Sequence, residues 1–164
     1  MSGFESSDGI AVAVSGDLLV ALWSEPGTLE RMRWLGARLD AFAGHRSEGE
    51  VLMLMVILPK SSPPQAAARA ESNSIARRLG GRTRLFVTVP LGDSLWLLVV
   101  RTVMRTTFLL SGNAKRLSIA NTEADGIRQI VEARRDATPG AHEIERMLAG
   151  LYSRLAVART WSSF

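Results

Sequence analysis

The chain of 164 residues contains no cysteine and only two histidines, His45 and His142. Without cysteine it forms no disulfides, has no thiolate nucleophile and cannot build a cysteine-based zinc or iron–sulfur site. Two histidines leave little material for a histidine-rich metal centre. Aromatic residues make up only 6% of the chain, which is few for a surface that stacks nucleic-acid bases. We therefore expect no metal and no cofactor.

Lysine is scarce as well, because 18 of the 20 basic residues are arginine. With 16 acidic residues the net charge is +4, a mild excess. A nucleic-acid-binding face needs its arginines gathered together, whereas here they are scattered among acidic residues along the chain. The charge pattern thus predicts no nucleic-acid partner.

No stretch of the sequence has the length and apolarity of a membrane helix, which needs about 20 apolar residues. The most apolar long segment, 95–110, is interrupted by Arg101 and Arg105. Residues 1–8 are polar and acidic, unlike a secretory signal with its basic and apolar regions. We therefore expect no membrane span and a cytoplasmic protein.

Short apolar runs rich in β-branched residues alternate with segments of helical periodicity. The predicted strands are 10–14, 18–23, 51–58, 85–89 and 116–120. The predicted helices are 29–43, 64–79, 95–111, 122–134 and 139–159. The turn at 15–17 makes the first two strands a hairpin, and the alternation that follows favours a mostly parallel or mixed sheet layered with helices. The fold class is α/β, with about five strands and an extra C-terminal helix.

Residues 9–134 form the predicted domain, and the only seam in the sequence lies at residues 136–137. The segment 138–160 then carries a regular apolar stripe and is an appended amphipathic helix. This helix packs either on the same domain or on a partner, and the sequence leaves both alternatives open.

Residues 51–58 are apolar on both faces, which predicts a central strand covered by helices on both sides. The loop after this strand reads Lys60-Ser61-Ser62-Pro63. This placement and the element order over 9–134 resemble the STAS family, the sulfate transporter and anti-sigma-factor antagonist domains. In that family the loop usually reads Asp-x-Ser-Gly and holds a regulatory phosphoacceptor. Here the Asp is missing and Pro63 replaces the Gly.

The resemblance implies a non-enzymatic regulatory or protein-interaction domain with a protein partner, in which Ser61 or Ser62 would be the phosphoacceptor. A phosphate there would meet the free N–H groups of the following helix, and its charge would change partner binding. From the residues alone, the same loop is also interpreted as a simple helix-capping turn.

The chain contains none of the common catalytic motifs, neither the nucleophile elbow nor the phosphate-binding, dinucleotide-binding or zinc-protease patterns. A Ser–His–acid triad would have to recruit one of the two histidines. His45 follows the helix-ending Gly44, and His142 lies beside Glu143 in the first turn of the last helix. We predict no catalytic residue, and an unrecognised enzyme is the weakest of three alternatives.

The segment 95–110 is apolar nearly all round its helical circumference, more than one sheet can cover. Either the appended helix covers it within the chain, or two chains pair there as a homodimer. The candidate interface residues are Trp96, Val100, Met104, Leu148, Leu151 and Tyr152.

The main alternative to a protein-interaction domain is a small-molecule-binding domain. An apolar pocket between the sheet and the helix at 95–110 would accept a lipid-like or acidic ligand. Arg101 and Arg105, four residues apart on one helix face, are the candidate contacts for an anionic headgroup.

Overall fold

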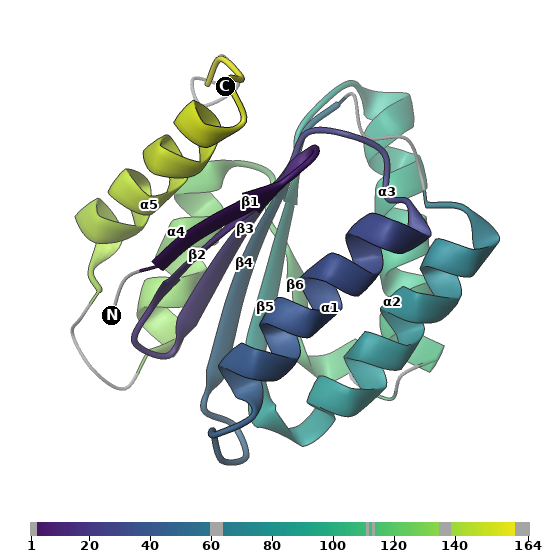
Figure 1. Ribbon diagram of the computed structural model, residues 1–164, viewed down its shortest axis with the longest axis horizontal. Coiled ribbons are helices and arrows are strands. Elements are labelled where there is room, and N and C mark those ends of the chain that lie inside the picture. The colour runs from purple at the N-terminus through teal and green to yellow at the C-terminus, as the bar shows by residue number, and fades with distance from the viewer. Residues whose placement is uncertain (1–2, 60–63, 111, 113, 135–138, 160–164) are drawn as a thin grey trace.

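The computed structural model describes residues 3–59, 64–110, 112, 114–134 and 139–159. One six-stranded mixed sheet carries helices on both of its faces (Figure 1). The strands are β1 (Gly3–Ser7), β2 (Ile10–Ser15), β3 (Leu18–Trp23), β4 (Val51–Ile57), β5 (Thr83–Pro90) and β6 (Leu117–Ile119). The helices are α1 (Leu29–Ala43), α2 (Ala66–Leu79), α3 (Ser94–Leu110), α4 (Glu123–Ala133) and α5 (Ala141–Arg154). The predicted α/β class, opening hairpin and C-terminal helix are confirmed.

The expected number of about five strands is too low, because β1 adds a sixth. It pairs antiparallel with β2 along its whole length, from Gly3 opposite Val14 to Ser7 opposite Ile10. Its sequence is mostly polar and mostly exposed, so it has no apolar alternation by which a strand is recognised. The backbone ladder to β2 makes it a strand.

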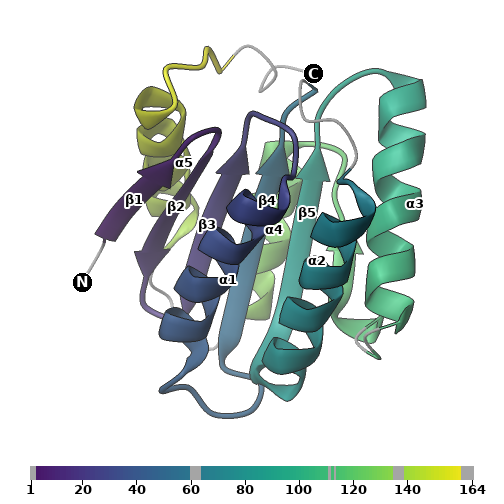
Figure 2. The same cartoon turned by 45° about the vertical axis from the view of Figure 1, so that its right-hand side comes forward.

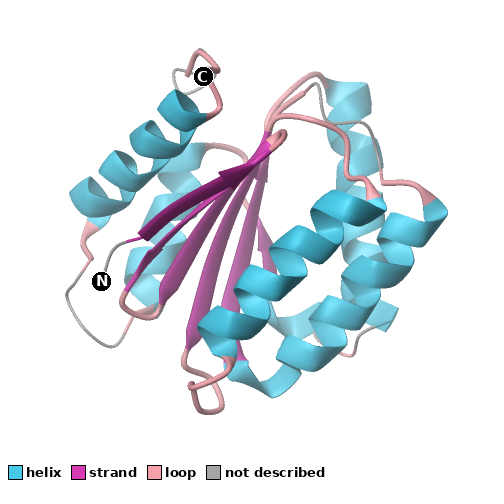
Figure 3. Cartoon of the chain, viewed as in Figure 1, coloured by secondary structure: helices cyan, strands magenta, loops and turns pink. Residues whose placement is uncertain are grey.

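The strands follow one another across the sheet in sequence order, β1 to β6. The β1–β2 and β2–β3 pairs are antiparallel, whereas β3 to β6 are parallel. Each parallel step runs in the same direction, and crossovers of one hand therefore place α1, α2 and α3 on the same face (Figure 2). We call this the three-helix face. Helices α4 and α5 cover the opposite one, the two-helix face (Figure 3).

Side chains of β4 alternate between two separate cores, as expected for a central strand. Leu52, Leu54 and Val56 belong to the core under α4 and α5, and Val51 and Met53 to the core under α1 and α2. All five are buried. The prediction that this strand is covered on both faces is confirmed.

Helix starts follow the expected capping chemistry. The side chains of Thr28, Asp93 and Thr122 accept hydrogen bonds from the backbone N–H three residues further on, at 3.2, 2.8 and 3.1 Å. Gly140 directly precedes α5.

The apolar face of α5 is covered within the chain. Ile144, Leu148 and Leu151 are 0% exposed, and α5 packs on β2 and β3. Gly150 lets the helix approach β1 closely, since a Cβ there would lie 2.7 Å from Phe4 Cε1. Of the two alternatives for this helix, the structure therefore has it on its own domain. It does not cover α3, as one hypothesis had it, because the two helices lie on opposite faces of the sheet (Figure 1).

Among the described residues, no helix combines the length and the apolarity needed to cross a membrane.

Candidate functional site

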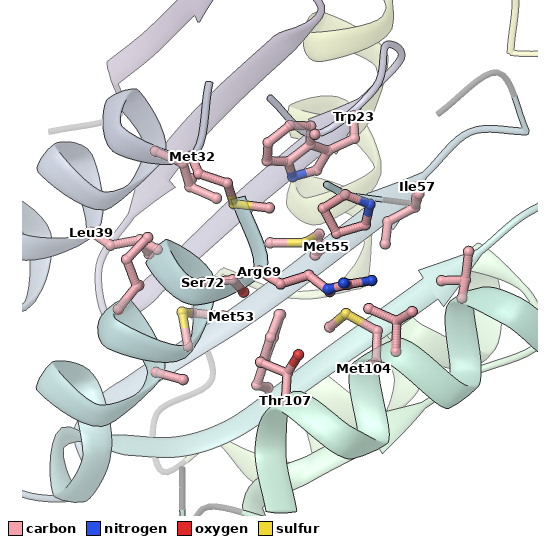
Figure 4. Close-up of a pocket in the computed structure, with 18 of the residues that line it drawn as sticks. Trp23, Met32, Leu39, Met53, Met55, Ile57, Arg69, Ser72, Met104 and Thr107 are labelled. Atoms are coloured by element: carbon pink, nitrogen blue, oxygen red, sulfur yellow. The ribbon is translucent and has the colours of Figure 1, made fainter. Parts of the chain in front are cut away.

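An apolar pocket of about 110 Å³ lies on the three-helix face, between the sheet and α1, α2 and α3 (Figure 4). Its floor is built by the side chains that β3, β4 and β5 direct to this face. These floor residues are Trp23, Met53, Met55, Ile57 and Phe86. The helices form the walls with one apolar stripe each. The wall residues include Met32, Leu35, Leu39, Ile75, Leu79, Trp96, Val100, Val103 and Met104.

Methionine is concentrated around this pocket. Four of the six methionines of the chain line it, namely Met32, Met53, Met55 and Met104. The methionine side chain is unbranched and polarisable, and it adapts its shape to irregular apolar surfaces. The lining can therefore adjust to apolar groups of different shapes.

The pocket exists because α3 has an incomplete surface to pack on. The edge strand of the sheet beneath α3 is β6, and it has only three residues, all of them half-buried. Among the described side chains of α3, only Val100 and Thr107 are buried. Helix α3 therefore lies over the short edge of the sheet, and space is left between it, α2 and the longer strands.

Few polar side chains reach the pocket. Arg69 and Ser72 come from α2, Thr83 begins β5, and Thr107 comes from α3. Thr83 and Thr107 are 4% and 6% exposed, so their hydroxyl groups are buried against the apolar lining. Within the described residues, no aspartate or glutamate lines the pocket.

Arg69 differs from the other arginines that lie near it. Its guanidinium makes no hydrogen bond or ion pair with any side chain in the part of the chain that the structure describes. Arg78, two turns further along α2, pairs with Asp40 at 3.1 Å and lies 3.9 Å from Glu71. Arg69 is exposed and yet belongs to the pocket lining, so an uncompensated positive charge lies at the edge of an apolar space.

The outer side of α3 is apolar and exposed to solvent. Leu95, Leu98, Leu109 and Leu110 are 74%, 64%, 68% and 66% exposed. The sequence predicted more apolar surface on this helix than one sheet can cover, and these four leucines belong to the uncovered part.

The six residues expected at an interface are divided between the two faces of the sheet. Trp96, Val100 and Met104 line the pocket on the three-helix face. The remaining three, Leu148, Leu151 and Tyr152, are buried in the core under α4 and α5. They do not form one surface.

The two arginines expected to contact an anion do not line the pocket. Arg101 donates a hydrogen bond to Asn121 Oδ1, and Arg105 is exposed on α3. The arginine that does line the pocket is Arg69. The sequence holds no signal for it, because only the packing of α2 beside α3 brings Arg69 to the pocket.

Ser61 and Ser62, the candidate phosphoacceptors, lie outside the described residues. The chain on either side is described: Leu58, directly after β4, is buried in the core under α4 and α5, and Pro64 lines the pocket.

The two-helix face contains a buried carboxylate, Glu123, which is 3% exposed. Its Oε1 accepts a hydrogen bond from the Tyr152 hydroxyl at 2.5 Å, and its Oε2 accepts two from Arg159, at 2.9 and 2.7 Å. Burial, together with the bond to the carboxylate, raises the pKa of Tyr152 above its usual range. Both carboxylate oxygens of Glu123 thus have hydrogen-bond partners. The cluster of Glu123, Tyr152 and Arg159 joins the end of α5 to the start of α4.

The two histidines are both exposed, His45 after α1 and His142 in the first turn of α5. Over the described ranges, no three acidic or histidine side chains gather in a way that could hold a metal ion. Glu143 accepts a hydrogen bond from the Ser15 hydroxyl at 2.8 Å, a contact that joins α5 to β2.

Comparison with known protein families finds no family model that matches the chain, and no curated protein matches it significantly.

Proposed function

We propose that this protein is a non-catalytic small-molecule-binding domain, and that its ligand occupies the apolar pocket on the three-helix face. The pocket itself is the observation that carries the proposal. It combines an apolar lining, four methionines and a few polar side chains at its edge, the usual composition of a ligand site.

The volume limits the size of the ligand. A cavity of about 150 Å³ in another protein's core stays dry and binds benzene. A pocket of about 110 Å³ is of the same order. The apolar part of the ligand is therefore a single ring or a short alkyl chain, and a long acyl chain would have to extend into solvent.

An apolar pocket favours a ligand that fills it. Protein interiors leave few voids larger than a water molecule. Side chains that line an unfilled space lack partner atoms on that side. A ligand that fills the pocket would supply these contacts, which favours binding without any change of fold.

Tryptophan fluorescence provides the test, because Trp23 and Trp96 both line the pocket. We expect the tryptophan fluorescence to change and then saturate on addition of neutral ligands of the right size, cyclohexanol and 1-hexanol. Isothermal titration calorimetry would confirm the binding. Val103→Phe adds volume inside the pocket and should abolish binding. Leu98→Phe adds the same ring on the exposed side of α3 and should leave binding intact.

Circular dichroism would check that both variants are folded. If Val103→Phe does not fold, Ser72→Leu is the second variant that fills the pocket. Absence of saturable binding by either alcohol to the wild-type protein would overturn the proposal.

The exposed leucines of α3 favour a second candidate, a regulatory protein-interaction domain of the STAS-like kind. Leu98 and Leu109 are more than 60% exposed, and both lie on the same helix. In this candidate the surface pairs with a protein partner or a second copy in the cytoplasm, and phosphorylation of Ser61 or Ser62 regulates the pairing. Light scattering that gives a clean monomer at micromolar concentration would exclude the homodimer.

A further inference from the structure

We infer that the ligand of this pocket is a small carboxylic acid in its ionised form, whose carboxylate is held by Arg69. The inference rests on the proposed function and adds the chemical class of the ligand to it.

The position of Arg69 is the first argument. It lies near the start of α2, and Figure 4 shows its side chain extending from that helix toward the side of the pocket formed by Ile57 and Met104. A cation is thus held at the boundary between solvent and the apolar lining. An amphiphile with its apolar part inside would have its polar end at this boundary.

The lack of a compensating charge is the second argument. No described carboxylate pairs with Arg69, and no described acidic residue lines the pocket. Guanidinium is weakly hydrated compared with ammonium, and its planar fork binds a carboxylate through two parallel hydrogen bonds. A ligand carboxylate would supply the partner that this part of the chain does not.

The surroundings of Arg69 favour an anion as well. The first turn of α2 contains no acidic residue, so the positive end of the helix dipole is not neutralised there. Ser72 lies three residues further on the same face of α2 and also lines the pocket. Its hydroxyl is a second donor within the same turn.

A pair of matched ligands separates the charge from the shape. Cyclohexanecarboxylate and cyclohexanecarboxamide have the same ring and a planar head of similar size, but only the first is an anion at neutral pH. Tryptophan fluorescence and calorimetry would measure the affinity of the full-length protein for each of the two ligands. We expect the carboxylate to bind at least about ten-fold more tightly than the amide, as for a charge-assisted hydrogen bond.

Arg69→Gln should abolish this preference and leave the affinity for the amide unchanged. Arg77→Gln is the matched control, because Arg77 is an exposed arginine of the same helix that does not line the pocket. It should leave both affinities as they are in the wild type. Added salt should weaken binding of the carboxylate and not of the amide.

The outcomes distinguish the two proposals. Equal affinities for carboxylate and amide in the wild type would overturn the carboxylate inference and leave the apolar pocket as a binding site. A loss of preference in Arg77→Gln equal to that in Arg69→Gln would also overturn it, since the effect would then come from net charge. If neither the two ligands nor the neutral alcohols bind, the proposed function fails as well.

Discussion

The two faces of the sheet are covered to very different degrees. On the two-helix face, Ile130, Ile144, Leu148 and Leu151 are 0% exposed, and α4 approaches so closely that a Cβ on Gly126 would lie 2.6 Å from Val89 Cγ2. On the three-helix face, a pocket remains under α3 and leucines on that helix point into solvent. The strands are shared, so the difference comes from the helices and from where each one lies.

Buried polar groups do not follow the same contrast. The buried Glu123 on the two-helix face has hydrogen-bond partners for both carboxylate oxygens. Buried atoms with no hydrogen-bond partner in the described structure occur on both sides, the hydroxyl of Thr88 on the three-helix face and Nε of Arg134 at the end of α4. The difference between the faces therefore lies in apolar packing, with the unfilled space under α3.

The largest effect should come from truncating the core of the two-helix face. Leu148→Ala removes a fully buried side chain from a closely packed region and should lower the free energy of unfolding by about 3–4 kcal/mol. Met104→Ala truncates a half-buried side chain that already lies beside empty space and should cost less, about 2 kcal/mol, at the low end for such truncations. Urea denaturation of both variants measures the difference, and equal losses would contradict the contrast between the faces.

Removing the buried carboxylate should have the next largest effect. Glu123→Ala leaves Tyr152 and Arg159 without their shared acceptor and should cost about 2–3 kcal/mol, at the low end for a buried pair because Arg159 is partly exposed. Glu145→Ala, at an exposed position of α5, is the control and should change stability by less than about 0.5 kcal/mol. If the two variants were equally stable, Glu123 would not anchor α5.

The same cluster predicts alkaline instability. The folded state raises the pKa of Tyr152, so this contribution is fully present below the unfolded value of about 10 and is lost as pH rises above it. Above pH 10 the unfolding free energy should fall by up to about 1.4 kcal/mol per pH unit through this group. Tyr152→Phe should lack this part of the slope. Because Tyr152 is the only tyrosine of the chain, tyrosinate absorbance reports it directly.

The smallest effect is expected on the outer side of α3. Leu98→Glu replaces a side chain that is 64% exposed and should change the stability of the monomer by less than about 0.5 kcal/mol. Thermal unfolding at several protein concentrations is the measurement. If Leu98→Glu lowered the free energy of unfolding by more than about 2 kcal/mol, and this loss grew with protein concentration, a second copy of the chain would cover this surface in solution.

Local patterns were sufficient to predict most of the elements. The alternation of apolar runs and helical stripes is enough to place β2 to β6 and all five helices. β1 was missed because its residues are polar, and the backbone pairing with β2 that makes it a strand cannot be seen in its own sequence.

The candidate site was predicted only in outline. A pocket between the sheet and the helix at 95–110 was among the hypotheses, and Trp96, Val100 and Met104 were singled out, though as interface residues. The contribution of α1 and of Arg69 was not foreseen. Periodicity shows which face of a helix is apolar, but not which helix will lie next to it.

The sequence by itself determined the fold class, the central position of β4 and the excess of apolar surface on α3, because each depends on the order of residues within one segment. The tertiary structure decided where that excess lies. Helix α5 packs on the face opposite α3, and the three-residue β6 gives α3 too little surface to rest on. The pocket is therefore a property of packing between segments distant in sequence, where no local pattern records how much space remains.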